Sequence, residues 1–414
     1  MSRALYSLAL YLLLPWALLH LVWRARKQPA YLEHVGERFG FFPNNMPSRV
    51  IWIHAVSVGE TRAAEPLIEA LRARHPEHRI LLSHGTPTGR QTSKDLYGER
   101  IERCYLPYDF GWATRRFLRR FRPVAGVFVE TEIWPNLIRA SVQSAVPVYL
   151  VNARMSEKSA RGYRRIGRLT RATLSKLSGI GAQTDRDAQR LVDLGAKDVS
   201  ITGNIKFDRL APAEMLALGA ALRESFGTRR PVFLAASTRE GEEAMILDAL
   251  ANSTIPELLT AIVPRHPQRF EEVAVLVKQR GIKYQRRSGN RPIEADTRVV
   301  IGDSMGEMFA YYAACDVAFI GGSLLPLGGQ NLLEACAVGR PVIVGPHTFN
   351  FEDATRGAIE AGAAIRVSDA DELGNAIDQL LGDSARRRAM SEAGKRFTDV
   401  HRGATEKTLR LLRW

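Results

Sequence analysis

The feature that most limits the fold of this chain is a rhythm that begins at Val50, where short apolar runs start to alternate with longer amphipathic stretches. The runs VIWIHAV, RILLSHG, VAGVFVE and VPVYLVN each have the length of a buried strand, and the helix-like stretch TRAAEPLIEALRARH separates the first two. This alternation predicts a parallel sheet covered by helices. A further strand, GIGAQ, and a short strand-like SITGN bring the first such domain to residue 207.

The same rhythm begins again after a helical, polar stretch at residues 211–227, with the runs PVFLAAS, LLTAIVPR, VVIGD, DVAFIGG and PVIVGP. The 414 residues are enough for two domains of about 100–200 residues each. We therefore predict an α/β fold with an N-terminal segment at residues 1–27 and two Rossmann-like domains, residues 28–207 and 208–414. The domains are expected to face each other across a cleft at the carboxyl ends of their sheets. The last helix, from about Ser384 to Arg413, is expected to pack back on the N-terminal domain.

The N-terminal segment predicts a membrane anchor. The stretch from Ala4 to Trp23 carries no formal charge, and about 20 apolar residues are what a helix needs to cross a hydrocarbon core of ~30 Å. Arg24, Arg26 and Lys27 follow this stretch, whereas only Arg3 precedes it. Positive charge on that side predicts that the rest of the chain lies in the cytoplasm.

Two alternatives for this segment stay open. A cleaved signal peptide is one, although no small-x-small cleavage site follows the apolar stretch. A helix that inserts into one leaflet is the other, because Pro15 and His20 interrupt the apolar stretch.

The net charge of +14 indicates an anionic partner, which is nucleic acid, an anionic membrane or a phosphorylated substrate. Arginines mixed with aromatic residues at 113–123, and a similar stretch at 161–171, carry part of this charge. Beside an apolar anchor they favour a surface that meets anionic inner-membrane lipid, and a solvated helix face is the alternative. Neither stretch has the pattern of an RNA-binding module, so no nucleic-acid partner is predicted.

Several kinds of chemistry lack their sequence signature. The three cysteines form no C-x-x-C pair, so neither a disulfide framework nor a zinc site is predicted. The D-x-D strings at 185–187 and 369–371 lie at expected helix starts, where aspartate acts as a cap, and no metal site is predicted there. Neither a G-x-G-x-x-G after the first strand nor a G-x-x-x-x-G-K-S/T is present, which argues against a dehydrogenase or a P-loop enzyme. No cofactor is predicted.

Acidic and basic residues follow the strands of the first domain. Glu60 lies in HAVSVGET, where it either contributes to a ligand site or complements the dipole of the helix that begins there. Glu130 and Glu132 in ETEIWPN end another strand and would share one face in extended geometry. Lys206 in TGNIKFD is either a phosphate contact at the domain junction or a solvated lysine in a linker.

The second domain has its own candidate segments. Arg265 lies in PRHP, a basic loop stiffened by two prolines that suits a phosphate. A helix is expected to start at the turn of residues 304–306, where free N–H groups would receive ligand atoms. The strongest signal is the glycine-rich stretch 321–346, in which a helix is expected to open at about Asn331. Glu334, one turn into it, would accept hydrogen bonds from a ribose.

Taken together, these motifs resemble one family, the bacterial transferases of 3-deoxy-D-manno-octulosonic acid (Kdo). The resemblance runs from the N-terminal helix to about residue 350, and so many motifs in the right order make it specific. The motifs are HAVSVGE, TPTG at 86–89, LPYD at 106–109, ETEIWPN, NAR at 152–154, GNIKFD, ASTREGEE at 236–243, PRHP and GGQNLLE.

The resemblance implies an activity and a place in the cell. The family uses CMP-Kdo as donor and the tetraacyl disaccharide bisphosphate precursor of lipid A as acceptor, and it inverts the anomeric centre. Its fold is the two-domain glycosyltransferase B fold, and it acts at the cytoplasmic face of the inner membrane. The N-terminal domain would then bind the acceptor and the C-terminal domain CMP-Kdo.

The resemblance also implies roles for particular residues. Glu60 would be the general base, and Glu130 and Lys206 would stabilise the transition state. The CMP-binding segments would be Pro264 and Arg265, the turn Met305, Gly306 and Glu307, and the helix start Asn331, Leu332, Leu333 and Glu334. One departure is Arg239, where a histidine is expected, and it puts only a peripheral contact in doubt.

Two other classes of function compete with this interpretation. The first is another two-domain enzyme of sugar nucleotides, such as a lipid A disaccharide synthase, a glycosyltransferase of peptidoglycan precursors or a UDP-sugar epimerase. A preference for UDP over CMP would favour it. The second is a catalytically inert membrane scaffold that binds anionic lipid through the arginine-rich stretches. The number of Kdo units transferred cannot be derived from any of these motifs.

Overall fold

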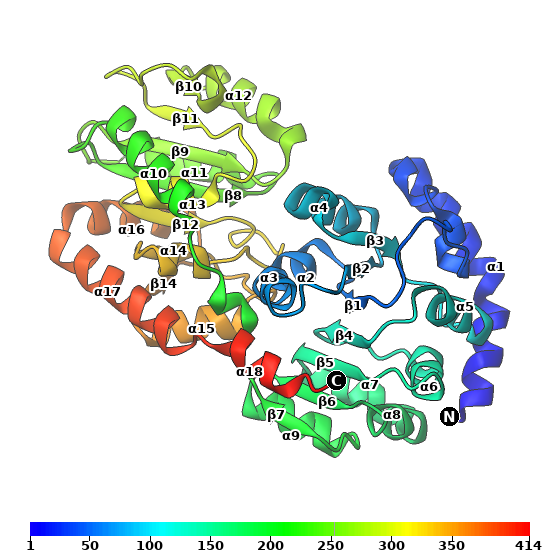
Figure 1. Cartoon of the computed structure of the whole chain (residues 1–414). Helices are drawn as coiled ribbons and strands as arrows, with labels where there is room; N and C mark the ends of the chain where they lie inside the picture. Colours follow the sequence, from blue (N-terminus) through cyan, green and yellow to red (C-terminus); the bar gives the residue numbers. More distant parts are fainter. Residues whose placement is uncertain (252) are drawn as a thin grey trace. The chain divides into compact units, whose positions relative to one another are not determined.

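The computed structural model of the protein describes residues 1–251 and 253–414. The chain divides into two compact units, Met1–Arg209 with Arg402–Trp414, and Leu210–His401. Each unit holds one seven-stranded, wholly parallel sheet with helices around it (Figure 1). The predicted α/β fold with two Rossmann-like domains is therefore confirmed.

The sheet of unit 1 has the strand order β3-β2-β1-β4-β5-β6-β7. The order reverses between β1 and β4, and this switch point is where ligands bind in open α/β sheets. Trp52 and Phe128, from these two strands, are fully buried and pack edge to face. The strands are β1 (Ile51–His54), β2 (Ile80–His84), β3 (Glu102–Tyr105), β4 (Ala125–Val129), β5 (Val148–Ala153), β6 (Gly179–Ala182) and β7 (Val199–Ile201).

Ten α-helices surround this sheet in the described part of unit 1. Five of them begin after a serine or threonine whose hydroxyl accepts a backbone N–H of the first turn, namely α1, α2, α4, α7 and α9. The helices are α1 (Arg3–Lys27), α2 (Val58–Ala63), α3 (Glu65–Arg74), α4 (Pro87–Tyr97), α5 (Gly111–Phe121), α6 (Pro135–Gln143), α7 (Glu157–Arg165), α8 (Gly167–Leu174), α9 (Asp185–Asp193) and α18 (Ala404–Leu411).

The sheet of unit 2 has the order β10-β11-β9-β8-β12-β13-β14, with its switch point between β8 and β12. The strands are β8 (Val232–Thr238), β9 (Leu259–Pro264), β10 (Tyr284–Arg286), β11 (Val299–Ile301), β12 (Val317–Ile320), β13 (Val342–Val344) and β14 (Ala364–Arg366). The helices are α10 (Ala213–Phe226), α11 (Glu242–Ala251), α12 (Phe270–Gln279), α13 (Met308–Ala314), α14 (Leu333–Ala337), α15 (Glu352–Glu360), α16 (Ala370–Gly382) and α17 (Ser384–Val400).

Three strands, β3, β10 and β14, were not predicted from the sequence, and each lies at an edge of its sheet. Edge strands are short and only partly buried, so they need no apolar run. Their sequences are ERCY, YQR and AIR.

The C-terminal region differs from the single expected helix. Residues 384–413 form two helices, because the chain turns at Gly403, whose φ of 93° is a left-handed conformation that favours glycine. The first, α17, belongs to unit 2, and the second, α18, belongs to unit 1. Asp208 accepts the backbone N–H of Gly403 at 2.7 Å and also that of Thr405. The start of α18 is thereby held to unit 1.

The arginine-rich stretch at 113–123 separates its two kinds of side chain. On α5, Phe117 and Phe121 are fully buried in the core, whereas Arg115, Arg116 and Arg119 are exposed. The expectation that arginines and aromatic residues of this stretch share one surface is therefore wrong for these phenylalanines. The helical period turns them inward while the arginines point outward.

Candidate active site

The loop after β1 holds the first predicted catalytic residue, Glu60. Ser57 caps helix α2, and its hydroxyl donates to Oε1 of Glu60 at 3.0 Å. The backbone N–H of Val56 donates to Oε2 of Glu60 at 2.7 Å. These two bonds fix the carboxylate at the carboxyl end of β1, beside the switch point. Both the role of complementing the helix dipole and the ligand role, which the sequence left open, are compatible with this geometry.

The environment of Glu60 changes its acidity. Burial raises the pKa of Glu60 to about 7, the bond from Val56 opposes this rise, and the negative charge of Glu130 adds to it. A carboxyl group with a pKa near neutrality can accept a proton from a hydroxyl group and release it again at physiological pH.

The end of β4 places Glu130 next to Lys206. The Nζ of Lys206 donates to Oε1 of Glu130 at 2.8 Å, which joins the end of β4 to the 3₁₀ turn η4 (Ile205–Asp208). Glu130 has a φ of 64°, an uncommon conformation for a residue with a side chain. Eight other described residues with side chains also have a positive φ, so this conformation by itself marks a sharp turn at the end of β4.

This left-handed turn corrects one expectation. Glu130 and Glu132 were expected to share a face by strand alternation, but β4 ends at Val129 and the chain leaves extended geometry at Glu130. The alternation of side chains between the two faces of a strand therefore does not extend to Glu132.

Glu132 nevertheless belongs to the same electrostatic group. Its Oε2 accepts the Nε1–H of Trp134 at 2.8 Å and lies 3.9 Å from Nε2 of His54. Burial, followed by the charge of Glu60, raises the pKa of Glu132 to about 7. Burial lowers the pKa of His54 to about 4, so this imidazole is neutral at pH 7. Nδ1 of His54 faces the carbonyl oxygen of Ser83 at 3.1 Å.

A second cluster in unit 2 surrounds Glu242, a residue that the sequence interpretation did not single out. Its carboxylate is fully buried and accepts the backbone N–H groups of Arg239 at 2.9 Å, Gly322 at 2.5 Å, Ser323 at 3.0 Å and Leu324 at 3.0 Å. These bonds tie the loop after β8 to the glycine-rich loop after β12, across the switch point. A buried position was not evident because EGEE reads as a polar helix start.

Glycine is required in this loop where backbones meet. A side chain at Gly321 would lie 2.5 Å from the carbonyl oxygen of Ser237, and one at Gly345 would lie 2.3 Å from that of Ser323. The glycine content that the sequence associates with a ligand therefore also serves close packing.

The predicted CMP-binding residues lie at the carboxyl ends of strands in unit 2. Pro264 ends β9, and Nε of Arg265 donates to Oε1 of Gln330 at 3.3 Å, which links β9 to the residue before Asn331. Asn331 accepts the N–H of Leu333 at 3.1 Å and donates to Glu334 at 3.3 Å. Leu332 and Leu333 are buried.

The turn of residues 305–307 follows β11. Met305 and Gly306 are exposed, and Glu307 accepts the hydroxyl of Ser304 at 2.6 Å and pairs with Arg287 at 3.4 Å. Both helix starts in this region differ from expectation. Helix α13 begins at Met308 rather than at 304–306, and α14 begins at Leu333, so Glu334 lies in its first turn.

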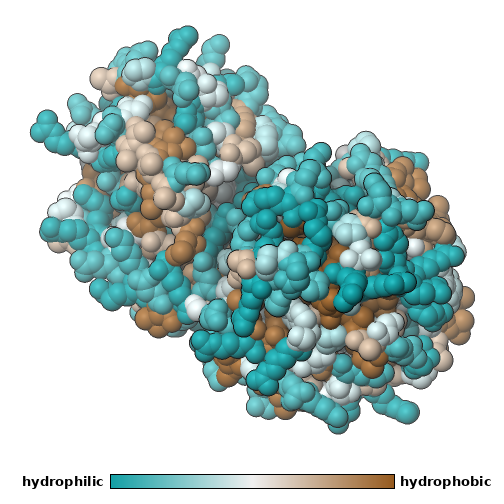
Figure 2. All heavy atoms as spheres, viewed as in Figure 1, coloured by the Kyte–Doolittle hydropathy of each residue, from teal (hydrophilic) through white to brown (hydrophobic). Residues whose placement is uncertain are grey.

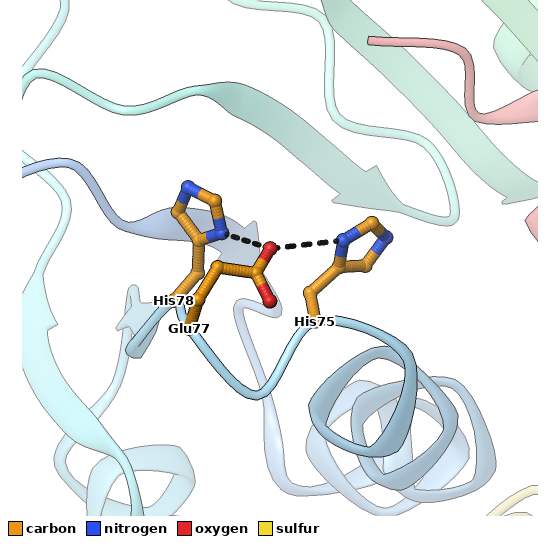
Figure 3. A group of neighbouring side chains, drawn as sticks. All are labelled: His75, Glu77 and His78. Atoms are coloured by element: carbon orange, nitrogen blue, oxygen red, sulfur yellow. Dashed lines mark hydrogen bonds and ion pairs between the residues drawn. The ribbon is translucent and has the colours of Figure 1, made fainter.

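Candidate metal ligands lie elsewhere in unit 1. In the described part of the chain, one group of three potential ligands comes together, in the turn between α3 and β2 (Figure 3). Oε1 of Glu77 lies 2.7 Å from Nδ1 of His78 and 3.5 Å from Nδ1 of His75. This turn precedes β2, at the end of the sheet opposite to Glu60. Of the D-x-D strings, Asp369 caps α16 as predicted, whereas the cap of α9 is Thr184, and Asp185 and Asp187 lie in the first turn of that helix.

Comparisons with known proteins agree on a family. Residues 33–209 match a family described as 3-deoxy-D-manno-octulosonic-acid transferase (kdotransferase), and residues 278–397 match glycosyl transferases group 1. The chain is 46% identical to the 3-deoxy-D-manno-octulosonic acid transferase of Bordetella pertussis, over 99% of this chain and 98% of the relative. It is 37% identical to the enzyme of that name from Haemophilus influenzae, over 100% and 98%.

A solved structure shows the same fold at low identity. A UDP-GlcNAc 2-epimerase from Neisseria meningitidis superposes with a TM-score of 0.60 and 14% identity, over 87% of this chain and 98% of the other. This likeness concerns the two-sheet architecture alone.

Proposed function

The chain belongs to the family of Kdo transferases, glycosyltransferases of lipopolysaccharide biosynthesis, and from this premise we propose its substrates and the roles of its site residues. The donor is CMP-Kdo and the acceptor is the tetraacyl disaccharide bisphosphate precursor of lipid A. Unit 1 binds the acceptor and unit 2 binds CMP-Kdo. The enzyme works at the cytoplasmic face of the inner membrane.

Glu60 is the general base of the proposed reaction. An acceptor hydroxyl attacks the anomeric carbon of Kdo, its proton passes to the Glu60 carboxylate, and the bond to the CMP phosphate oxygen breaks on the opposite face. One displacement of this kind inverts the anomeric centre and needs no covalent intermediate. The observation that carries this role is the half-buried Glu60 carboxylate at the switch point, held by Val56 and Ser57, with a pKa raised to about 7.

Glu130 and Lys206 stabilise the transition state in this proposal. Charge develops on the departing phosphate and on the sugar ring, and charged groups fixed in advance stabilise it without reorganising. The 2.8 Å bond between Lys206 and Glu130 supports a fixed pair of this kind.

The residues of unit 2 hold the CMP group of the donor. Arg265 supplies positive charge for the phosphate, and the loops with Met305, Gly306 and Glu307 and with Asn331, Leu332, Leu333 and Glu334 contact the nucleoside. Pro264 stiffens the first of these loops. Their common position at the carboxyl ends of β9, β11 and β12 supports this assignment.

The test is transfer from freshly generated CMP-Kdo to the tetraacyl precursor in detergent, with the product identified by its mass. We expect an added mass of one or more Kdo residues, which also gives the number of units. UDP-sugars offered in place of CMP-Kdo are the control. Transfer from a UDP-sugar and none from CMP-Kdo would reject the proposed donor.

A further inference from the structure

Helix α1 presents a continuous apolar stripe to its surroundings. Leu5, Leu8, Leu12, Trp16 and Leu19 recur every three or four residues, and each is 54–72% exposed. By length and composition alone, the helical segment Arg3–Arg26 is long enough and apolar enough to cross a membrane. Figure 2 shows brown surface at the right-hand edge of unit 1, where Figure 1 draws α1 beside α5 and α6. A contiguous exposed apolar surface of this kind marks a site that binds a protein or a membrane.

The first turns of α1 are bonded to the folded part of unit 1. The hydroxyl of Tyr6 donates to Oδ2 of Asp109 at 2.9 Å, and Ser7 exchanges hydrogen bonds with the Asn136 side chain at 3.1 and 3.3 Å. Asp109 is itself buried and also accepts the backbone N–H groups of Asn136 at 2.9 Å and Leu137 at 2.7 Å. The start of α1 is thus joined to the loop after β3 and to the start of α6.

The middle and the end of α1 contact the same unit. The rings of Tyr11 and Phe110 lie 5.1 Å apart. Near the end of the helix, Leu21 and Ala25 are buried in a cluster with Tyr31. The first third of the helix is therefore joined to the body of unit 1, while its last turns pack on the segment that directly follows it.

These contacts conflict with a membrane span. At about 1.5 Å per residue, Tyr6 and Arg24 are separated by roughly 27 Å along the axis, close to the ~30 Å hydrocarbon core. In a spanning helix, Tyr6 would therefore lie across the bilayer from the unit that begins after Lys27. The same unit contributes Asp109, which Tyr6 contacts.

We propose that α1 is an in-plane anchor, which lies along the cytoplasmic interface of the membrane with its leucine and tryptophan stripe among the acyl chains and its other side on unit 1. The proposal specifies how the membrane association in the proposed function is achieved, and it rests on that association. The side of α1 opposite the stripe is partly covered by protein, since Leu10, Leu14 and Ala17 are half-buried and Leu21 and Ala25 are buried. This side therefore needs fewer polar residues than that of a free amphipathic helix.

Neighbouring side chains extend the stripe with groups that suit a lipid interface. The ring of Phe110, which contacts Tyr11, lies 6.0 Å from the ring of Trp112. The guanidinium of Arg116 lies over the ring of Trp112 at 5.3 Å and over that of Phe41 at 4.3 Å. Phe41 is 57% exposed. Tryptophan, tyrosine and arginine are typical of the headgroup region.

Charge favours lipid over a second copy of the chain. Two chains of net charge +14 repel each other, whereas Lys and Arg side chains are attracted to an anionic leaflet. The exposed arginines of α5 adjoin the stripe through Arg116.

The first experiment locates the start of α1. The full-length Ser2→Cys variant is labelled with a membrane-impermeant maleimide in spheroplasts and in inverted inner-membrane vesicles. The native Cys104, Cys315 and Cys336 are at most 1% exposed and contribute little background. We expect labelling in inverted vesicles only. Labelling from the outside of spheroplasts would show a span and overturn the proposal.

The second experiment measures depth with spin labels at three stripe positions, in vesicles of phosphatidylglycerol and phosphatidylethanolamine without donor or acceptor. Cysteines at Leu5, Leu12 and Leu19 lie two turns apart on one side of the helix, so an in-plane anchor gives them equal, shallow depths. A span gives a maximum at Leu12. Lys94→Cys, at an exposed position of α4, is the aqueous control.

The two possible failures are distinguishable. A maximum of depth at Leu12 rejects the in-plane anchor and leaves membrane association intact. If all three spin labels are exposed to water, membrane association itself is rejected. Dipolar broadening between the labels of two chains would instead identify a second copy as the partner of the stripe. Transfer of Kdo in detergent is independent of all three outcomes.

Discussion

Two glutamates occupy corresponding places in the two units, yet their surroundings differ. Glu60 and Glu242 each follow the first strand of a seven-stranded parallel sheet, beside its switch point. Glu242 is fully buried and accepts four backbone N–H groups, from Arg239, Gly322, Ser323 and Leu324. Glu60 accepts one backbone N–H and one hydroxyl, and its pKa is raised to about 7. Four backbone donors make Glu242 a link between two loops, whereas burial leaves Glu60, with two donors, as a carboxyl group whose pKa lies near neutrality.

The largest expected effect is on catalysis in Glu60→Gln. Loss of a general base lowers the rate by roughly 10²–10⁴-fold, measured as initial Kdo transfer by product mass. Gln still accepts the N–H of Val56, so the folded structure should persist. Because a raised folded-state pKa means that the ionised form of Glu60 is disfavoured by folding, stability at pH 8 should be unchanged or higher.

The control for this variant is Glu99→Gln, which changes a glutamate whose side chain is 90% exposed. It should keep full activity. A fully active Glu60→Gln would show that the proposed base is wrong even though the family is right.

The next effect is on stability in Glu242→Gln. The amide cannot replace a carboxylate as acceptor of four N–H groups, and hydrogen bonds to charged groups contribute about 1.5–3 kcal/mol each. We expect the free energy of unfolding to fall by about 2–4 kcal/mol, measured in urea.

Glu240→Gln, in the same loop but exposed, is the matched control and should leave the free energy of unfolding unchanged. If Glu242→Gln had the same free energy of unfolding as the wild type, the inference that Glu242 stabilises the fold, in contrast to Glu60, would be wrong.

The smallest effect is a shift in pH dependence. A base must be deprotonated, so the transfer rate of the wild type should fall as the pH drops through about 7, the raised pKa of Glu60. Glu132→Gln removes a carboxyl that interacts with Glu60, so the midpoint should move to lower pH. The charged or titratable groups that interact with Glu132 are Glu60 on α2, Glu130 after β4, His54 on β1 and Tyr163 on α7.

The measurement is the initial rate between pH 5 and 9 at saturating donor, for the wild type and for Glu132→Gln. An unchanged midpoint with a reduced rate would mean that Glu132 only supports the fold through Trp134 and His54.

The sequence was informative where local pattern is sufficient. Buried parallel strands require apolar runs, so the central strands of both sheets were predicted, and a glycine-rich loop after β12 was evident from composition. Edge strands such as β14 are exposed on one side and carry no such pattern. Family motifs supplied the roles of Glu60, Glu130 and Lys206, which position alone left open and which remain proposals.

The sequence by itself determined the α/β architecture, the family and an apolar N-terminal helix, because periodicity and ordered motifs are local properties of the chain. Only the tertiary structure decided which carboxylates interact, that Glu242 is buried, and that Tyr6 at one end of α1 contacts Asp109. These features depend on contacts between residues far apart in the chain. Burial and hydrogen-bond partners, which set the acidity of a carboxyl group, exist only after such residues have come together.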